Sequence, residues 1–409
     1  MQPSFKIAIV GSGPSGLMAA TRLSRDPRFE IHIFEKRKGL GRKLLIAGSS
    51  GLNISHDADP SEFARYYSEW SPRWNPEFWP KMLANFSPKD WIEFIEKELR
   101  METFVGTSGR FFVREMKASG LLQRWTEFLR QRGVVFHPDH DLTDFEVDGD
   151  QVRLQFNGSL VHDDPAFTFD QSAFFLGGAS WLEKESPDWA EHFRRRGIEL
   201  AEFQPSNAGY EVNWKSEFLK EAEGKPLKKI LLSSPKGSKL GELVVTRYGL
   251  EGTPIYFFGA KGEIMLDLKP DLSTAQMIEK CEAVRENLSP LRRVKKVLGL
   301  GDAALALLFH HADQAVKNDL KKLIAAIKSF PLELGAPRPL QESISSKGGV
   351  RFTQLTEALE LRKFPGIYCG GEMLDWDAPT GGFLIQASVS QGAWVAESIL
   401  SNAAKSKRR

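Results

Sequence analysis

The sequence predicts an α/β fold in which a Rossmann-like domain is interrupted by an inserted domain, β-rich at first and then helical. Three observations lead to this prediction. An apolar strand at the start of the chain runs into a glycine-rich turn and a helix, and a second strand then ends in an acidic residue. Near the C-terminus, a further apolar strand, glycine pairs and a long helix indicate a return to the first domain.

The first strand is predicted over residues 6–10, because consecutive apolar residues are typical of a parallel strand buried on both faces. A helix is expected from Leu17 to Leu23. Gly11 permits a tight turn, Gly13 lets the backbone approach a pyrophosphate, and Gly16 lets helix and strand pack closely. The helix N-terminus presents unpaired N–H groups to phosphate. The predicted phosphate-binding turn contains Gly11, Gly13, Pro14, Ser15 and Gly16.

The second strand, residues 30–34, ends at Glu35, about where an acidic side chain accepts hydrogen bonds from a ribose 2′-OH. The same carboxylate would repel a 2′-phosphate. A basic run follows, and it has two interpretations: a solvated surface turn, or a phosphate-facing segment. We count Lys36, Arg42 and Lys43 among the predicted cofactor-binding residues.

Composition places the chain among ordinary globular proteins. Its 409 residues suggest two or three domains, and a formal net charge of +2 does not point to nucleic acid. We find no signal peptide and no apolar run long enough to cross a bilayer, so we expect no membrane insertion. The two cysteines have no metal-ligand spacing and suit a reducing compartment, which predicts a cytoplasmic protein and no metal.

Residues 44–55 read as a loop that holds its backbone against a ligand, with Gly48 and Asn53 as candidates; a plain surface loop is the alternative. Residues 60–100 are rich in aromatic side chains and predict a small helical excursion. An amphipathic helix is expected over 117–132, followed by strands at 133–136, 142–145, 152–156, 167–169 and 173–176. The last of these runs into Gly177 and Gly178, a second place for close backbone approach.

The inserted domain starts where the pattern changes, near residue 198. Short strands are predicted at 230–232, 243–245, 255–258 and 264–268, and helices follow from Ser273, which forms a capping box with Gln276. Residues 299–304 also fit a glycine-rich nucleotide turn, but the charged segment before them argues against a central strand. We therefore predict four segments: 1–197 and 339–409 in the first domain, 198–270 as a β-rich insert and 271–338 as a helical insert.

The C-terminal segment supplies the far end of a long ligand pocket. A strand at 364–369 leads to Gly371, Glu372 and Asp375, and then to Gly381, Gly382 and Phe383 at the start of a helix over 384–400. FAD, a long dinucleotide, needs such groups: acids for the pyrophosphate–ribitol stretch, and a helix N-terminus that stabilises the reduced flavin. The sequence therefore predicts FAD as the cofactor.

The glycine-rich motifs together resemble the BaiN/YhiN-type NAD(P)/FAD-dependent oxidoreductases of the two-dinucleotide-binding-domain superfamily. The resemblance covers nearly the whole chain and implies an FAD domain of the glutathione-reductase type with one insertion. It also implies that the backbone of Leu142 pairs with the adenine. The motifs that carry it are residues 11–16, Gly41-Arg-Lys43, 177–181, 245–252, 345–350 and 371–382.

Two stretches depart from the family pattern. Where relatives carry Gly-Gly-Gly-Arg-Cys-Asn, this chain has Gly48-Ser-Ser-Gly-Leu-Asn53, so no thiol chemistry is implied. Residues 183–188 replace an expected Gly-Ser-Asp-Gly loop, which points to a difference on the substrate side or at a local FAD contact.

The expected reaction is hydride transfer from NADH or NADPH through FAD to a small organic acceptor such as a conjugated enone or quinone. The transient reductant would bind between the FAD domain and the insertion. Tyr248 is the candidate proton donor, and Arg247 and Arg110 are further candidates for the substrate site. Three alternatives stay open: a flavoprotein reduced directly by its substrate, an FAD-dependent RNA-modifying transferase, and a non-catalytic flavin module.

Overall fold

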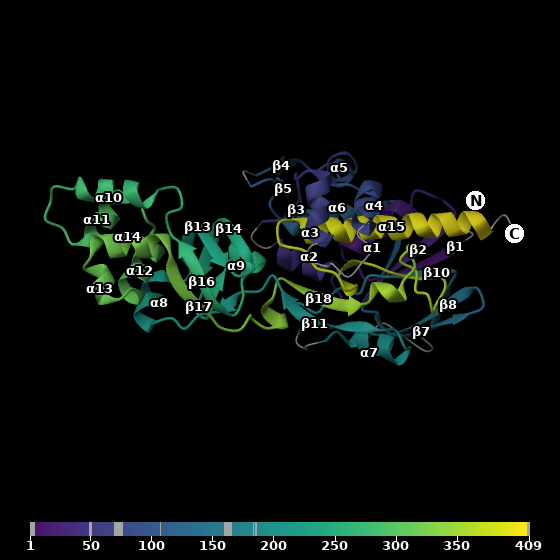
Figure 1. Ribbon diagram of the computed structural model, residues 1–409. Coiled ribbons are helices and arrows are strands. Elements are labelled where there is room, and N and C mark those ends of the chain that lie inside the picture. The colour runs from purple at the N-terminus through teal and green to yellow at the C-terminus, as the bar shows by residue number, and fades with distance from the viewer. Residues whose placement is uncertain are drawn as a thin grey trace. The chain divides into compact units, whose positions relative to one another are not determined.

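The computed structural model describes residues 5–48, 51–68, 77–106, 108–158, 166–182, 184 and 186–406. The chain forms two compact units (Figure 1). Unit 1 comprises Met1–Gln204 and Ser346–Arg409, and unit 2 comprises Pro205–Ser345. The sequence placed the two junctions at 197/198 and 338/339, slightly earlier in the chain. The chain leaves unit 1 through β11 (Leu200–Ser206) and returns through β18 (Ser345–Val350), and these two strands pair.

A five-stranded parallel sheet forms the centre of unit 1, in the order β19-β10-β1-β2-β6. The register aligns Val10 with both Phe34 and Phe174, so the strands β1, β2 and β10 end at one edge. This arrangement confirms the predicted Rossmann-like α/β fold. The strands are β1 (Phe5–Val10), β2 (Phe29–Glu35), β6 (Val135–Pro138), β10 (Gln171–Phe174) and β19 (Ile367–Cys369).

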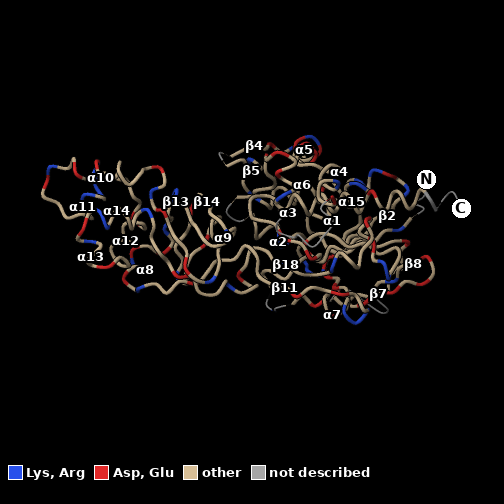
Figure 2. Tube along the Cα trace, in the orientation of Figure 1, with Lys and Arg blue, Asp and Glu red and all other residues tan. Residues whose placement is uncertain are grey.

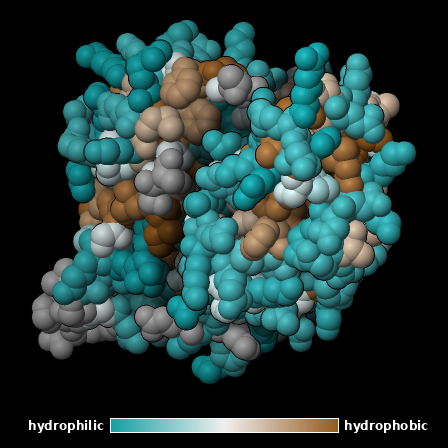
Figure 3. Space-filling view, turned by 90° about the vertical axis from the view of Figure 1, so that its left-hand side faces the viewer, coloured by the Kyte–Doolittle hydropathy of each residue, from teal (hydrophilic) through white to brown (hydrophobic). Residues whose placement is uncertain are grey.

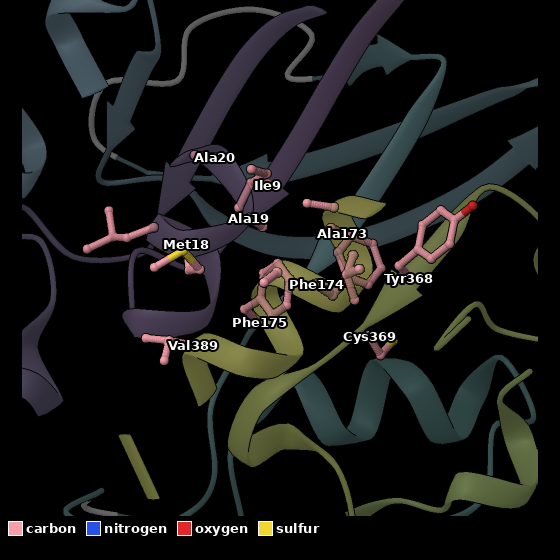
Figure 4. Close-up of a cluster of buried hydrophobic side chains, with 14 of the residues drawn as sticks. Ile9, Met18, Ala19, Ala20, Ala173, Phe174, Phe175, Tyr368, Cys369 and Val389 are labelled. Carbon is pink, nitrogen blue, oxygen red and sulfur yellow. The ribbon is translucent and has the colours of Figure 1, made fainter. Parts of the chain in front are cut away.

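Helices α1 (Pro14–Leu23) and α15 (Phe383–Ser406) pack along each other beside this sheet. Their backbones approach closely, since a Cβ built on Gly392 would lie 2.2 Å from the Ser15 carbonyl oxygen. Figure 4 shows the apolar side chains that α1 and the sheet bury together, among them Ile9, Met18 and Phe174, all fully buried. Burial of each large apolar side chain contributes roughly 1.5–3 kcal/mol.

A three-stranded antiparallel sheet, β7-β8-β9, packs against the parallel sheet through aromatic side chains. The Phe34 ring on β2 stacks on the Phe156 ring on β8, with centroids 4.3 Å apart. Short helix α7 follows. The bounds are β7 (Asp141–Asp148), β8 (Gln151–Asn157), β9 (Ala166–Phe169) and α7 (Asp188–Arg195).

The aromatic segment after β2 is helical, as the sequence predicted, and its described tryptophans Trp79 and Trp91 are buried packing residues. Residues 44–55 are not a loop throughout: helix α2 ends at Ala47 and strand β3 begins at Asn53. The apolar run Leu44-Leu-Ile-Ala47 continues the helix that starts at Arg42. The bounds are α2 (Arg42–Ala47), β3 (Asn53–His56), α3 (Pro60–Ser68), α4 (Phe78–Asn85), α5 (Pro88–Glu93), the π-helical turn η1 (Phe94–Glu98), β4 (Thr103–Val105), β5 (Arg110–Val113) and α6 (Ala118–Gln131).

Unit 2 contains a six-stranded antiparallel sheet in the order β12-β15-β14-β13-β16-β17. The prediction of a strand at 255–258 was wrong, because this segment belongs to helix α9 (Thr253–Phe258), whose first turn contains Pro254 with its fixed φ. The strands are β12 (Tyr210–Glu211), β13 (Pro226–Ser234), β14 (Gly237–Val245), β15 (Gly249–Glu251), β16 (Gly262–Asp267) and β17 (Phe330–Leu334).

Unit 2 also carries a helical part with its own apolar core. The predicted capping box is present, with the Gln276 amide N–H donating to the Ser273 hydroxyl. The segment before the second glycine turn is helical, as its charge suggested. The helices are α8 (Ser216–Ala222), α10 (Thr274–Glu282), α11 (Pro290–Val297), α12 (Asp302–His311), α13 (Gln314–Lys317) and α14 (Leu320–Lys328).

Candidate cofactor site

The glycine-rich turn between β1 and α1 has the geometry of a phosphate-binding loop. Gly11 has φ +111°, and a Cβ there would lie 2.1 Å from the Phe175 carbonyl oxygen. A Cβ on Gly16 would lie 2.0 Å from the Gly11 carbonyl oxygen, whereas no atom of a described residue lies within 4 Å of one built on Gly13. Gly11 and Gly16 are therefore required by the fold, and Gly13 leaves space for a ligand beside the backbone.

Helix α1 begins without a side-chain cap, because Gly13 occupies its N-cap position. The first N–H groups of the helix therefore face the open space beside Gly13 with the positive end of the helix dipole. An anionic group is the natural partner for such a helix start.

Glu35 lies beside this turn at the end of β2. Its Oε2 accepts hydrogen bonds from the Ser12 hydroxyl and from the Ser12 amide at 3.2 Å, and its Oε1 accepts from the Arg37 amide at 3.1 Å. The Ser12 hydroxyl also accepts from the Gly41 amide at 2.9 Å. The carboxylate is held in one place at the pocket wall, as a group that is to accept hydrogen bonds from a ribose must be.

Segments far apart in the chain line one pocket next to the turn. Thirteen of the predicted cofactor-binding residues lie in its wall, and they come from the ends of β1, β2 and β10, the starts of α1, α2 and β7, and the C-terminal segment. These residues are Gly11, Gly13, Pro14, Ser15, Glu35, Lys36, Arg42, Lys43, Leu142, Gly177, Gly178, Gly371 and Glu372.

Lys43 lines the pocket and contacts residues from two other segments of the chain. Its Nζ donates a hydrogen bond to the Gly178 carbonyl at 2.8 Å and lies 3.6 Å from Glu372 Oε2. Burial lowers the pKa of the Lys43 ammonium, and the charge of Glu372 only partly offsets that effect. Lys43 thereby ties α2, the turn after β10 and the C-terminal segment to each other at the pocket.

The remaining predicted residues do not line this pocket. Gly16 packs α1 against the turn, and Gly48 contacts α6, where its Cβ would lie 2.4 Å from that of Ala118. Asp375 donates its amide to the Val350 carbonyl at 2.9 Å. The Phe383 side chain is buried among His56, Phe63 and Tyr66 rather than exposed to a ligand, so only its backbone could serve a cofactor.

A second polar cluster surrounds the start of α15. Gly381 and Gly382 have φ +125° and +95°, and a Cβ on Gly382 would lie 2.4 Å from the Ser55 carbonyl oxygen. Arg110 lies close by, with Nε 3.8 Å from a Cβ built on Gly381, and burial lowers its pKa. Asn53 belongs to the adjoining strand β3, and its Oδ1 is buried without a hydrogen-bond partner among the described residues.

The other two catalytic candidates lie in unit 2. The Tyr248 hydroxyl donates to Glu251 Oε1, and the Arg338 guanidinium lies 4.4 Å from the Tyr248 ring centroid. Burial, followed by Glu251, raises the pKa of Tyr248, so its phenol stays protonated at neutral pH but is a weaker acid than a free tyrosine. Arg247 is exposed in the turn between β14 and β15.

Several pocket residues were missed from the sequence. The Ser12 hydroxyl donates a hydrogen bond to Glu35 and holds the carboxylate in place. The position of Ser12 between Gly11 and Gly13 was the only sequence feature that could have identified it as a pocket residue. His140, Trp189 and Ser388 also line the pocket, but no local pattern marks them. The Ser346 hydroxyl accepts from the Ala179 amide at 2.8 Å and supports the turn after β10 from another part of the chain.

The described part of the chain shows neither a metal cluster nor a membrane-spanning helix. No cluster of three or more His, Cys, Asp or Glu side chains there is placed to hold a metal ion. Within the same residues, no helix has both the length and the apolar character needed to cross a membrane.

Comparison with known proteins gives one family and several distant relatives. Residues 5–398 match the family profile described as "HI0933-like protein Rossmann domain". The chain is 23% identical over 415 residues to a 3-dehydro-bile acid delta(4,6)-reductase of Clostridium scindens, covering 95% of this chain and 97% of that protein. It is also 23% identical over 411 residues to a ribosomal RNA dihydrouridine synthase of Escherichia coli, covering 95% and 96%.

Among solved structures, the chain is similar to a 3-ketosteroid delta1-dehydrogenase from Sterolibacterium denitrificans. The TM-score is 0.53 with 11% identity, over 97% of this chain and 99% of that one. A 3-ketosteroid-delta4-(5alpha)-dehydrogenase from Rhodococcus jostii gives a TM-score of 0.50, also at 11% identity, over 97% and 96%. At this identity the likeness speaks for the fold alone.

Proposed function

The chain belongs to the HI0933-like family, a family of FAD-dependent oxidoreductase-like enzymes, and we propose that it reduces a carbon–carbon double bond conjugated to a carbonyl group. The observation that carries the proposal is the pocket at the end of β1, where an uncapped helix start, an open glycine and a fixed carboxylate face one space. These are the groups that a dinucleotide cofactor needs.

The pocket suits FAD from the adenosine to the pyrophosphate. Glu35 would hold the ribose hydroxyls, Leu142 would face the adenine, and the first turn of α1 would hold the phosphates beside Gly13. Lys43, kept near Glu372 and Gly178, would add a positive charge at the anionic end. Arg110 and the start of α15 would meet the flavin ring, where a positive field favours its reduced, anionic form.

The buried Asn53 Oδ1 supports this assignment independently. A buried oxygen without a partner costs free energy, and an acceptor in this position fits the N–H edge of a bound ligand. The orphaned atom lies on β3, the strand that packs against α15.

FAD, when bound, supplies the hydride chemistry, and we propose that NADH or NADPH provides the two electrons. The acceptor gains a hydride at the β-carbon and a proton at the α-carbon, and the nicotinamide is oxidised. Both relatives' names denote the saturation of a carbon–carbon double bond, in a bile acid and in uridine. The acceptor class therefore covers small enones and pyrimidine bases, so the near-neutral net charge does not exclude a nucleic-acid substrate.

The test is a visible spectrum of the purified protein, repeated anaerobically after addition of NADH and then NADPH. We expect a flavin spectrum that one nicotinamide bleaches and that an enone or a uridine-containing acceptor restores. A protein that cannot be reconstituted with FAD would refute the proposal. A flavin that neither nicotinamide reduces would favour direct reduction by the substrate or a non-catalytic flavin module.

A further inference from the structure

The helical part of unit 2 contains a groove of about 470 Å³ whose walls are strongly basic. Lys220 and Lys225 come from α8 and the turn after it, and Arg292 and Lys295 come from α11. Phe309, on α12, completes the wall. None of these residues belongs to the pocket at β1, and the reduction proposed above assigns them no role.

Positive charge exceeds negative charge in the groove. Against the four cations stand two carboxylates, Glu221 and Asp302. Glu221 Oε1 already lies 3.0 Å from His310 Nε2. Asp302 occupies the first turn of α12, where its negative charge interacts favourably with the positive end of the helix dipole. Figure 2 shows basic and acidic positions intermixed over the helical part of unit 2.

Two of the four basic side chains of helix α11 line the groove, and the other two contact the loop before the helix. Arg293 Nε donates to the Leu288 carbonyl at 3.1 Å, and Lys296 pairs with Glu286. Arg292 and Lys295 are exposed, line the groove, and form no ion pair or side-chain hydrogen bond with any described residue. The two groove-facing cations are therefore available to an external anion, and the other two support the loop before α11.

An exposed aromatic ring lies beside these cations. Phe309 is 52% exposed although its neighbours Leu307 and Leu308 are fully buried. Lys317 Nζ lies 5.4 Å from the Phe309 ring centroid and donates to its carbonyl at 2.9 Å, which holds the residue in place. In the space-filling view of Figure 3, hydrophobic residues form separate patches on a largely hydrophilic surface.

We propose that this groove binds a short single-stranded segment of RNA. The backbone phosphates would contact Lys220, Lys225, Arg292 and Lys295, and one base would stack on Phe309. A ring next to cations distinguishes this partner from an acidic peptide, which offers no base to stack. The inference goes beyond the proposed reduction and does not depend on it, because it rests on the groove alone.

The experiment is a fluorescence-anisotropy titration of a labelled single-stranded oligouridine with the full-length protein at several salt concentrations. Four phosphate contacts predict that log K falls with log salt with a slope of about −3. The double substitution R292Q/K295Q should weaken binding and make the slope shallower by about 1.4. F309A should weaken binding by about fivefold or more with an unchanged slope, and F309Y should retain it.

The matched control is R293Q/K296Q, which removes the same charge from the same helix at two residues that do not line the groove. It should leave both affinity and slope unchanged, and thermal unfolding of each variant verifies that it is folded. The inference is overturned if oligouridine does not bind at low salt, if the control weakens binding equally, or if poly-glutamate competes with the same dependence on Phe309.

The two proposals fail in different measurements. The groove variants should keep the flavin spectrum and its reduction by nicotinamide, because no groove residue lines the cofactor pocket. A protein that binds oligouridine through Arg292 and Lys295 but reduces no enone or uridine-containing acceptor would refute only the proposed reduction. A protein that reduces small enones but does not bind oligouridine would refute only the groove.

Discussion

Two stretches of this chain carry nearly the same glycine pattern, one in each unit, and only one builds a nucleotide-binding turn. Residues 11–16 follow strand β1 and precede a helix that packs on the parallel sheet. Residues 299–304 follow helix α11 instead. A Cβ on Gly299 or Gly301 would meet nothing within 4 Å, whereas Gly11 and Gly16 have backbone oxygens about where a Cβ would be. Whether this glycine pattern forms a nucleotide-binding turn therefore depends on the strand that precedes it, and the pattern alone does not decide it.

The largest contrast is expected for alanine at the first glycine of each turn. G11A places a Cβ 2.1 Å from the Phe175 carbonyl at φ +111°, so we expect roughly 3 kcal/mol of destabilisation and loss of bound flavin. G299A, at φ +61° in open space, should cost about 1 kcal/mol and retain flavin. Thermal unfolding and the flavin retained after desalting measure both effects. Equal losses in the two variants would contradict the comparison.

The next contrast separates cofactor binding in unit 1 from the proton donation that the sequence predicts for Tyr248 in unit 2. If the Tyr248 phenol donates the proton, Y248F should lower turnover by about 10²-fold or more while leaving flavin content unchanged. Y256F provides the control, since the Tyr256 pKa is also raised, first by burial and then by Glu251. Steady-state turnover and single-turnover flavin reduction distinguish the steps. Full activity in Y248F would remove Tyr248 from the mechanism.

A smaller effect is expected for the acid that follows the first turn. E35Q keeps the shape of the side chain but removes the charge that the ribose hydroxyls would meet, so FAD affinity should fall by about tenfold. E30Q, on the same strand, changes a residue that pairs with His32 outside the pocket and should leave affinity unchanged. Flavin fluorescence titration of the apoprotein gives both dissociation constants. A tenfold loss in E30Q as well would point to a general effect of charge.

The smallest effects concern pH, and among the described residues each unit contains one histidine whose pKa is lowered to about 4. The pKa of His137 is lowered to about 4 by burial and then by His32 and His140, and that of His311 to about 4 by burial and then by Lys215 and His310. Both are neutral when folded, so below pH 6.5 the unfolded chain binds more protons. Stability present above pH 6.5 should therefore be lost as the pH falls towards 4.

We expect H137N and H311N each to remove about 1 kcal/mol or less of this acid sensitivity. In each variant, the free energy of unfolding, measured from neutral to mildly acidic pH, should then change less with pH than in the parent protein. A profile that is parallel to that of the parent protein in both variants would assign the acid sensitivity to other groups.

Elements whose cause lies within a short stretch of sequence form as predicted. The strand and turn over residues 6–16 and the capping box at Ser273 need only neighbours in sequence, and the structure has both. The strand predicted at 255–258 is wrong, because aromatic residues favoured a strand there but the segment lies in a helix with Pro254 in its first turn. The position of the Phe383 side chain could not be predicted either, because the aromatic residues that surround it are distant in the sequence.

The sequence by itself determined that a nucleotide-binding turn stands at the start of the chain and that an acid follows it, because backbone conformation there depends on glycine and on strand length. Only the tertiary structure brought Ser12 to Glu35, Lys43 to Gly178, and the C-terminal Gly371 to Ser15. Those contacts join segments that are far apart in the sequence, so no local pattern predicts them. They form only when the parallel sheet brings β19, β10, β1 and β2 side by side.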